Sequence, residues 1–323
     1  MTEPVISLEG VHVVHKARSG GLLRRDRVYA LTDAHFSVRR GEILGVVGES
    51  GCGKSTLAKV IVGLQPATEG TVRFRGEDLW SLPPKRRRAE FGESVSMVFQ
   101  DASTALNPRL SVRRILRDPL DVHRKGTAAQ REKRVRELLD QVGLPEHVAE
   151  AMPAQLSGGQ RQRVAVARAL ALEPDVIVAD EPTSALDVSV RAQVLNLLVD
   201  LRASLGLGLV FISHDIQTVR YLADRIAVMY LGRVVEEGPA DDVGRHPYTR
   251  ALFSATPSLL GDGERIVLSG PVPSATHPPS GCPFRTRCWK ATDACADAFP
   301  SSAQGGDHSW RCLFPENPVR STL

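Results

Sequence analysis

The eight residues from Gly48 to Ser55 constrain the fold of this chain more than any other feature. They read GESGCGKS and fit the pattern G-x-x-x-x-G-K-S/T, a glycine-rich loop that binds phosphate. An apolar run at 43–47 precedes the loop and a helical pattern at 56–61 follows it, so the loop is expected to join a buried strand to a helix. The residues expected to contact a nucleotide here are Gly48, Glu49, Ser50, Gly51, Cys52, Gly53, Lys54, Ser55 and Thr56.

The residue types of this loop explain its chemistry. Its glycines let backbone N–H groups wrap phosphate oxygens without a clash from Cβ atoms, and the new helix points its N-terminus at the same anion. Lys54 is expected to reach the β and γ phosphates, and the Ser55 hydroxyl to bind Mg²⁺. Such a loop alone indicates only a nucleotide-binding protein.

Two adjacent carboxylates follow a second apolar run. Residues 176–179 read VIVA, and Asp180 and Glu181 come directly after them. Asp180, at the end of the expected strand, is placed to hold Mg²⁺. Glu181 is expected to act as the base, or the orienting group, for the water that attacks the γ-phosphate.

The segment Ser157, Gly158, Gly159 and Gln160 opens a strongly helical stretch. Ser157 is expected to cap this helix, while the two glycines let backbone N–H groups approach an anion. Without the other motifs, this segment would indicate only the start of a helix.

The order of the patterns predicts an α/β protein. From residue 5 to about 240, short apolar runs alternate with helical patterns, as in a mostly parallel sheet. Between about 101 and 160 the strand signal disappears, which predicts an inserted helical subdomain. The chain is therefore divided into a nucleotide-binding domain at 1–240 and a C-terminal segment at 241–323, which is expected to form a small separate module; it is proline-rich at 269–280 and contains four of the five cysteines.

Composition excludes several classes of protein. No apolar run approaches the about 18 residues that a transmembrane helix needs, and the first ten residues lack the pattern of a signal peptide. We therefore expect a cytosolic chain whose membrane role depends on partners. The net charge is +4 and only 5% of residues are aromatic, so the basic clusters at 24–25 and 85–88 are read as solvated surface and no nucleic-acid partner is expected.

Taken together, these motifs resemble the ABC transporter ATPase family. LSGGQ lies about 100 residues after the phosphate-binding loop and about 20 before the carboxylate pair. Three further elements are similar to family motifs: Gln100 to the glutamine that senses Mg²⁺ and the membrane subunits, residues 184–187 to the loop at the dimer interface, and His214 to the histidine that contacts the γ-phosphate. The resemblance implies the fold of a P-loop NTPase with an ABC nucleotide-binding domain. The family's adenine-stacking position falls on His15, with Tyr29 as the second candidate.

Further motifs resemble the oligopeptide/dipeptide importer branch of this family. They are FQD at 99–101, LNPR at 106–109, HPYT at 246–249, GCPF at 281–284 and RC at 287–288. The resemblance implies an ATPase that powers peptide import from the cytoplasmic face of the membrane. Its implied partners are two permease subunits, a second ATPase (sister or self) in a head-to-tail dimer, and indirectly an extracytoplasmic substrate-binding protein. Import of nickel or another small solute, or export, remains the alternative.

The last four cysteines raise the question of whether they bind a metal, form disulfides or remain free thiols. Cys282, Cys288, Cys295 and Cys312 have the spacing C-x₅-C-x₆-C-x₁₆-C. Disulfides are unusual in a reducing cytosol, and structural zinc sites draw paired ligands from tighter turns. Four thiolates suit a 4Fe–4S cluster, and the resemblance supports one because some peptide-importer ATPases carry it in this region. Unligated thiols remain the main alternative.

Overall fold

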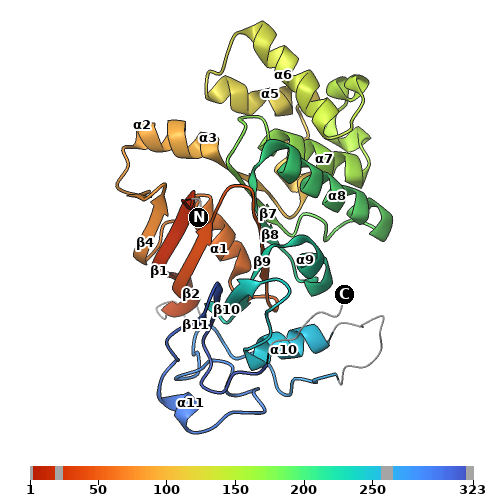
Figure 1. Ribbon diagram of the computed structural model, residues 1–323. Helices are drawn as coiled ribbons and strands as arrows, with labels where there is room; N and C mark the ends of the chain where they lie inside the picture. Colours follow the sequence, from red (N-terminus) through yellow and green to blue (C-terminus); the bar gives the residue numbers. More distant parts are fainter. Residues whose placement is uncertain (1–2, 19–24, 256–264, 318–323) are drawn as a thin grey trace. The chain divides into compact units, whose positions relative to one another are not determined.

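The computed structural model of this chain describes residues 3–18, 25–255 and 265–317 (Figure 1). The chain divides into two compact units. Unit 1 consists of Met1–Ile6, Val38–Glu42 and Phe74–Ile212, and unit 2 of Ser7–Ser37, Ile43–Arg73 and Ser213–Leu323. Each unit thus gathers segments that are distant in sequence.

Unit 1 is built around three parallel strands in the order β8-β7-β6. The strands are β6 (Val95–Val98), β7 (Val176–Asp180) and β8 (Gly208–Ile212), and the short β5 (Glu77–Asp78) also belongs to this unit. Every residue of β7 and β8 is buried, as expected for strands covered on both faces. Their parallel register places Asp180 beside Ile212, so the carboxyl ends of the two strands coincide.

Between β6 and β7 the described chain forms helices and no strand, and the bounds of the helical insertion stay a prediction from the sequence. The helical elements of unit 1 are α2 (Pro84–Arg86), the π-helical turn η1 (Arg87–Phe91), α3 (Gly92–Ser94), α4 (Ala102–Ala105), α5 (Val112–Val122), α6 (Ala128–Gln141), the 3₁₀ turns η2 (Glu146–Glu150) and η3 (Pro153–Gln155), α7 (Gly158–Ala169) and α8 (Val188–Leu205).

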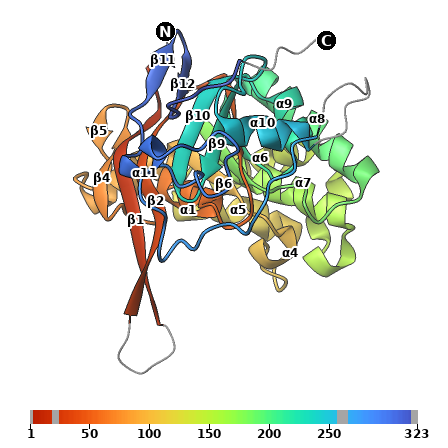
Figure 2. The ribbon, with the colours of Figure 1, turned by 90° about the horizontal axis from the view of Figure 1, so that it is seen from below.

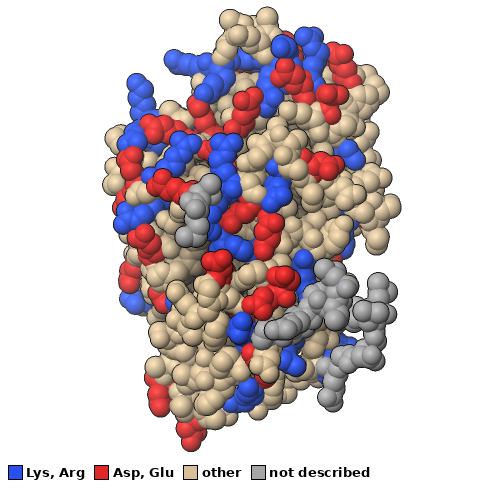
Figure 3. All heavy atoms as spheres, in the orientation of Figure 1, with Lys and Arg blue, Asp and Glu red and all other residues tan. Residues whose placement is uncertain are grey.

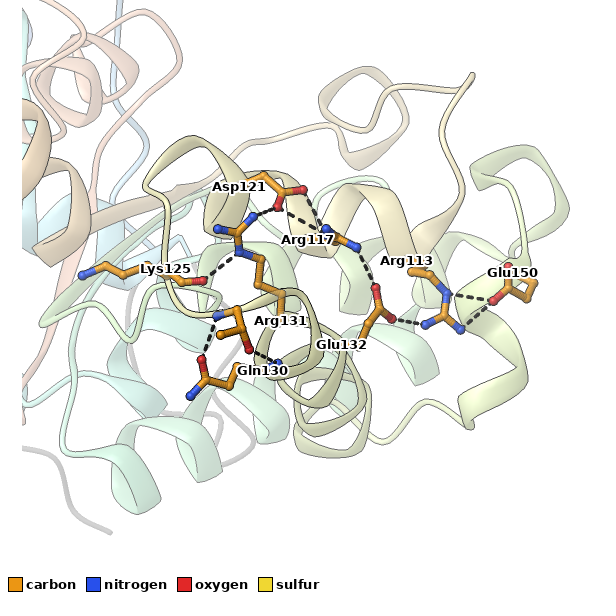
Figure 4. Close-up of polar contacts among 9 residues, drawn as sticks. Arg113, Arg117, Asp121, Lys125, Gln130, Arg131, Glu132 and Glu150 are labelled. Atoms are coloured by element: carbon orange, nitrogen blue, oxygen red, sulfur yellow. Dashed lines mark hydrogen bonds and ion pairs between the residues drawn. The ribbon is translucent and has the colours of Figure 1, made fainter.

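Arginine–carboxylate pairs tie the helical insertion together (Figure 4). Arg113 on α5 pairs with Glu132 on α6 and with Glu150 on η2, the latter at 2.6 Å from Nη2 to Oε1. Arg117 pairs with the same Glu132 at 3.0 Å. Arg117 is about one-third exposed, so these pairs fix the geometry of α5 and α6 more than they add stability.

The described residues of unit 2 form two sheets. The strands of the first are β1 (Ile6–Arg18), β2 (Arg25–Val38) and β4 (Glu69–Phe74), in the order β2-β1-β4. The second runs β11-β12-β10-β9-β3, with β3 (Ile43–Val47), β9 (Arg225–Tyr230), β10 (Arg233–Pro239), β11 (Ala303–Gly305) and β12 (His308–Trp310). The helices of this unit are α1 (Lys54–Ile61), α9 (Ile216–Leu222), α10 (Pro247–Ser254) and α11 (Ala294–Asp297).

The C-terminal segment joins the second sheet of unit 2. Strand β12 pairs antiparallel with β10, where Glu236 lies opposite Trp310, and Figure 2 shows β11 and β12 beside β10. This segment therefore shares a compact unit with the phosphate-binding loop. The division at residue 240 stays a prediction from the sequence.

Charges of both signs are interspersed on the face shown in Figure 3. In the basic cluster at 85–88, Arg86 pairs with Glu77 at 2.7 Å and with Glu90 at 2.8 Å, so part of this positive charge is balanced locally. In the other cluster, Arg24 lies outside the described residues. Over the described part of the chain, none of the helices has the length and apolar character needed to cross a bilayer.

Candidate nucleotide site

The phosphate-binding loop of unit 2 follows the fully buried β3 and leads into α1. Close backbone packing explains two of its glycines. A Cβ atom on Gly48 would lie 2.2 Å from the carbonyl oxygen of Met229, and one on Gly53 would lie 2.3 Å from that of Ala30. Gly53, the N-cap of α1, also has φ 106° and offers no side chain to bond the helix N–H groups. The first N–H groups of α1 therefore remain available to an anion.

Lys54 lies inside this loop and is only 6% exposed. Its Nζ donates to the carbonyl oxygens of Gly48 at 2.7 Å and Glu49 at 3.1 Å. Burial raises the pKa of the neighbouring Cys52 thiol, so that side chain stays neutral. Ser50 and Ser55 are exposed, and Thr56 is half-buried.

The carboxylate pair lies at the end of β7 in unit 1. Asp180 is 5% exposed. The N–H of Glu181 donates to the carbonyl oxygen of Ile212 at 2.9 Å, and its Oε2 lies 3.3 Å from Nε2 of Gln100. Glu181 has φ 45°, in the left-handed region that non-glycine residues rarely adopt. Residues with such strained backbone angles cluster at functional sites. The structure thus brings Gln100 and Glu181, two predicted site residues, into contact.

The predicted cap of α7 is present in unit 1. Ser157 Oγ accepts from the N–H of Gln160 at 3.2 Å, while Gln160 Oε1 accepts from the N–H of Ser157 at 2.9 Å. A Cβ atom on Gly159 would lie 2.5 Å from Val190 Cγ1, so Gly159 allows α7 to approach α8 closely. Beside it, Gly158 lies next to Leu186 of the predicted interface loop.

The remaining predicted contacts belong to unit 2. His214 is exposed and directly precedes Asp215, which caps α9 through bonds from the N–H groups of Gln217 and Thr218. Of the adenine-stacking candidates, His15 is exposed on β1 and Tyr29 is half-buried on β2. These observations give positions and leave the roles of His214, His15 and Tyr29 as predictions.

The four C-terminal cysteines border one small cavity. Cys282, Cys288, Cys295 and Cys312 all line a space of about 20 Å³, and all are free thiols. Burial raises the pKa of Cys282 and Cys288, and that of Cys312 to about 11. Within the described residues, no three Cys, His, Asp or Glu side chains converge closely enough to hold a metal ion.

Sequence reasoning missed two contacts with the phosphate-binding loop. Arg287 and Tyr248, both in the C-terminal segment, bond directly to Glu49. Each falls within a short motif singled out above, but no local pattern connects either motif to residue 49. A third missed feature lies at Asp187. The sequence pattern places Asp187 in the predicted interface loop, and the structure shows that its carboxylate also caps α8 by accepting from the N–H of Val190.

The family models and the relatives that match this chain agree with one another. A family model described as ABC transporter matches residues 31–184, and one described as Oligopeptide/dipeptide transporter, C-terminal region, matches 235–295. The chain is 43% identical over 309 residues to the dipeptide transport ATP-binding protein DppF of Haemophilus influenzae, with 94% of each chain covered. It is 44% identical over 306 residues to the oligopeptide transport ATP-binding protein AppF of Bacillus subtilis, covering 92% of this chain and 93% of the relative.

A solved structure with the same fold is the dimeric ATP-binding cassette MJ0796 in a post-hydrolysis state, bound to ADP and Pi. It is 33% identical to this chain, with a TM-score of 0.64, and the match covers 73% of this chain and 98% of the cassette. The match thus includes nearly all of a cassette that holds hydrolysis products.

Proposed function

Because this chain belongs to the ABC transporter ATPases, in the branch with an oligopeptide/dipeptide-type C-terminal region, we propose that it hydrolyses ATP to power import of dipeptides or oligopeptides through separate membrane subunits. The observation that carries the proposal is the match to a dipeptide transport ATP-binding protein along 94% of both chains. The predicted ABC ATPase fold is confirmed.

In this proposal the phosphate-binding loop holds the ATP phosphates. Lys54 turns from the carbonyl oxygens of its own loop to the β and γ phosphates. Ser55, Gln100 and Asp180 supply the oxygen ligands that Mg²⁺ prefers, and the buried carboxylate of Asp180 suits a divalent cation. When bound, Mg²⁺ neutralises charge that develops on the transferred phosphoryl group.

Hydrolysis is assigned to three side chains. Glu181 accepts a proton from the attacking water, and its contact with Gln100 supports a shared role at the γ-phosphate. His214 contacts the γ-phosphate. His15 is proposed to stack on adenine, with Tyr29 as the second candidate.

The Ser157–Gln160 segment is proposed to complete the site of a second ATPase subunit, sister or self, in a head-to-tail dimer. The dimeric form of MJ0796 supports this arrangement. Closure of the dimer on ATP, and its release after hydrolysis, would move two permease subunits at the cytoplasmic face of the membrane. An extracytoplasmic binding protein would deliver the solute.

We also propose that Cys282, Cys288, Cys295 and Cys312 hold a 4Fe–4S cluster. The type of donor supports it, because four cysteines line one cavity, although among the described residues they do not converge closely enough to hold a metal ion as they stand. A cavity of about 20 Å³ has room for about one water, so cluster binding requires the thiols to lose their protons and the cavity to widen.

Protein purified without oxygen should absorb at about 400 nm and contain about four irons. Cys288→Ser should lose both and Cys52→Ser should keep them; iron-free wild-type protein would contradict the cluster and leave the ATPase assignment intact.

Uptake measurements test the proposed solute class. Cells with and without this subunit are supplied with labelled dipeptides, longer peptides or Ni²⁺. Loss of peptide uptake alone supports the proposal, whereas loss of Ni²⁺ uptake with normal peptide uptake supports the alternative solute.

A further inference from the structure

Glu49, the second residue of the phosphate-binding loop, is bonded to an arginine 238 positions further along the chain. Arg287 Nη1 donates to Oε2 of Glu49 at 2.6 Å and Nη2 donates to Oε1 at 3.1 Å. The pair is bidentate, which is the strong form of an arginine–carboxylate contact. The Arg287 side chain is 7% exposed and that of Glu49 28%, so solvent screens the pair less than the surface pairs of α5 and α6.

The backbone of Glu49 is also held. Its N–H donates to the phenol oxygen of Tyr248 at 2.9 Å, and its carbonyl oxygen accepts from Lys54. This N–H group is therefore occupied, and a phosphate would be bound by the other loop N–H groups. Tyr248 is fully buried, and its ring packs against Tyr230 and Phe284 at 4.6 and 5.3 Å between centroids, so the position of its hydroxyl is fixed.

Electrostatics explains why such a loop needs the arginine. A carboxylate beside the phosphates of ATP repels them, and the repulsion grows with each negative charge on the nucleotide. Arg287 balances the charge of Glu49 and holds both carboxylate oxygens through its own N–H groups. Without Arg287, a partly buried carboxylate would remain unpaired next to the anion.

We propose that Arg287 and Tyr248 are positioning residues of the nucleotide site, and that Arg287 makes the loop receptive to polyphosphate by neutralising Glu49. The C-terminal segment thereby sets the ATP affinity of a loop that precedes it by about 200 residues. The inference rests on the proposed role of this loop in binding ATP.

Nucleotide titration of the full-length protein tests the inference. Fluorescent analogues of ATP and ADP are titrated into wild type, Arg287→Ala, and Arg287→Ala combined with Glu49→Gln. Arg287→Ala should weaken ATP binding by about tenfold and ADP binding by less, because ADP carries less charge. The double variant should recover most of the lost affinity, since the repelling carboxylate is gone. Arg285→Ala is the matched control, because the guanidinium of Arg285 donates to the backbone and side-chain oxygens of Ser280, and the substitution leaves the pair of Arg287 with Glu49 intact.

Two results of the titration would overturn the inference, and a third would overturn the proposed function. Equal ATP affinity in wild type and Arg287→Ala would overturn the inference. A loss that is equal for ATP and ADP, and that Glu49→Gln does not reverse, would also overturn it, since it would reflect general damage to the fold. If wild type itself bound neither nucleotide, the proposed function would fail instead.

Discussion

Lys54 illustrates how a single residue prepares the site. Its ammonium group is buried and bonded to the carbonyl oxygens of Gly48 and Glu49, so it is already desolvated and close to the place expected for the phosphates. We predict that Lys54→Ala weakens ATP binding by at least about tenfold, or about 1.4 kcal/mol. Titration of a fluorescent ATP analogue measures this, with the exposed Lys59 of the same helix changed to alanine as control. Equal affinities in the two variants would contradict the role of Lys54.

Glu236 on β10 is a second residue whose charge is held by the fold. It is 1% exposed, and it accepts N–H bonds from the backbone of Gly244, Arg245 and His246 and from Nε2 of His308. Burial alone would raise the pKa of the Glu236 carboxyl. The hydrogen bonds from His308 and the backbone outweigh burial and hold this pKa below its ordinary value of 4.5.

This lowered pKa gives a dependence of stability on pH. Above pH 4.5 the Glu236 carboxyl is ionised in both the folded and unfolded states, and its full stabilisation is present. As the pH falls from 4.5 through the lower folded-state pKa, that stabilisation is lost. We predict that Glu236→Gln lowers the free energy of unfolding by about 1–3 kcal/mol at pH 7, because the amide cannot accept all four bonds, and that it flattens the loss of stability below pH 4.5.

Urea denaturation at pH 7 and at several values below 4.5 measures both effects. Glu146→Gln, at an exposed position on η2, serves as control and should retain the wild-type profile. A wild-type acid profile in Glu236→Gln would show that this carboxylate does not carry the dependence.

At the scale of elements, α6 and α7 begin with the same capping arrangement. Thr127 and Gln130 exchange side chain–backbone bonds at the start of α6, as Ser157 and Gln160 do at α7. We predict that Thr127→Ala and Ser157→Ala each lower the free energy of unfolding by about 1 kcal/mol. Only Ser157→Ala should also reduce ATP-dependent dimerisation, because only that helix start is expected to face the partner's nucleotide.

Chromatography with light scattering, with and without Mg²⁺–ATP, measures the dimer fraction. An equal loss of dimer in the two variants would indicate that stability alone is responsible. Normal dimerisation of Ser157→Ala would remove Ser157 from the interface.

Sequence patterns predicted the strands next to the motifs because these strands are continuous apolar runs. The expected run at 176–179 is strand β7 with Asp180 added, and the run at 43–47 is β3. Strands β11 and β12 were not expected. Each has three residues, and those of β11 are exposed, so neither produces an apolar pattern. Their place in the sheet depends on pairing with β10, which lies about 70 residues earlier in the chain.

At the scale of the whole molecule, contacts between distant segments limited what the sequence could predict. The spacing of motifs was enough to predict the loop, the carboxylates and the LSGGQ segment as site residues, because each keeps its chemistry within a few neighbouring residues. The pair formed by Arg287 and Glu49 depends instead on how unit 2 assembles from three separate segments. Neither the local sequence patterns nor the composition indicates which distant segments come into contact.

The central claim is that ATP hydrolysis at this chain's own carboxylates powers peptide import. Its most direct test reconstitutes the transporter in proteoliposomes with wild-type or Glu181→Gln subunit, and measures phosphate release and labelled dipeptide uptake in the same sample. The variant should still bind ATP but lose nearly all of both activities, because an amide cannot accept the proton of the attacking water. Each tenfold loss in rate corresponds to about 1.4 kcal/mol of barrier. Phosphate release and dipeptide uptake at the wild-type rate in Glu181→Gln would contradict the account.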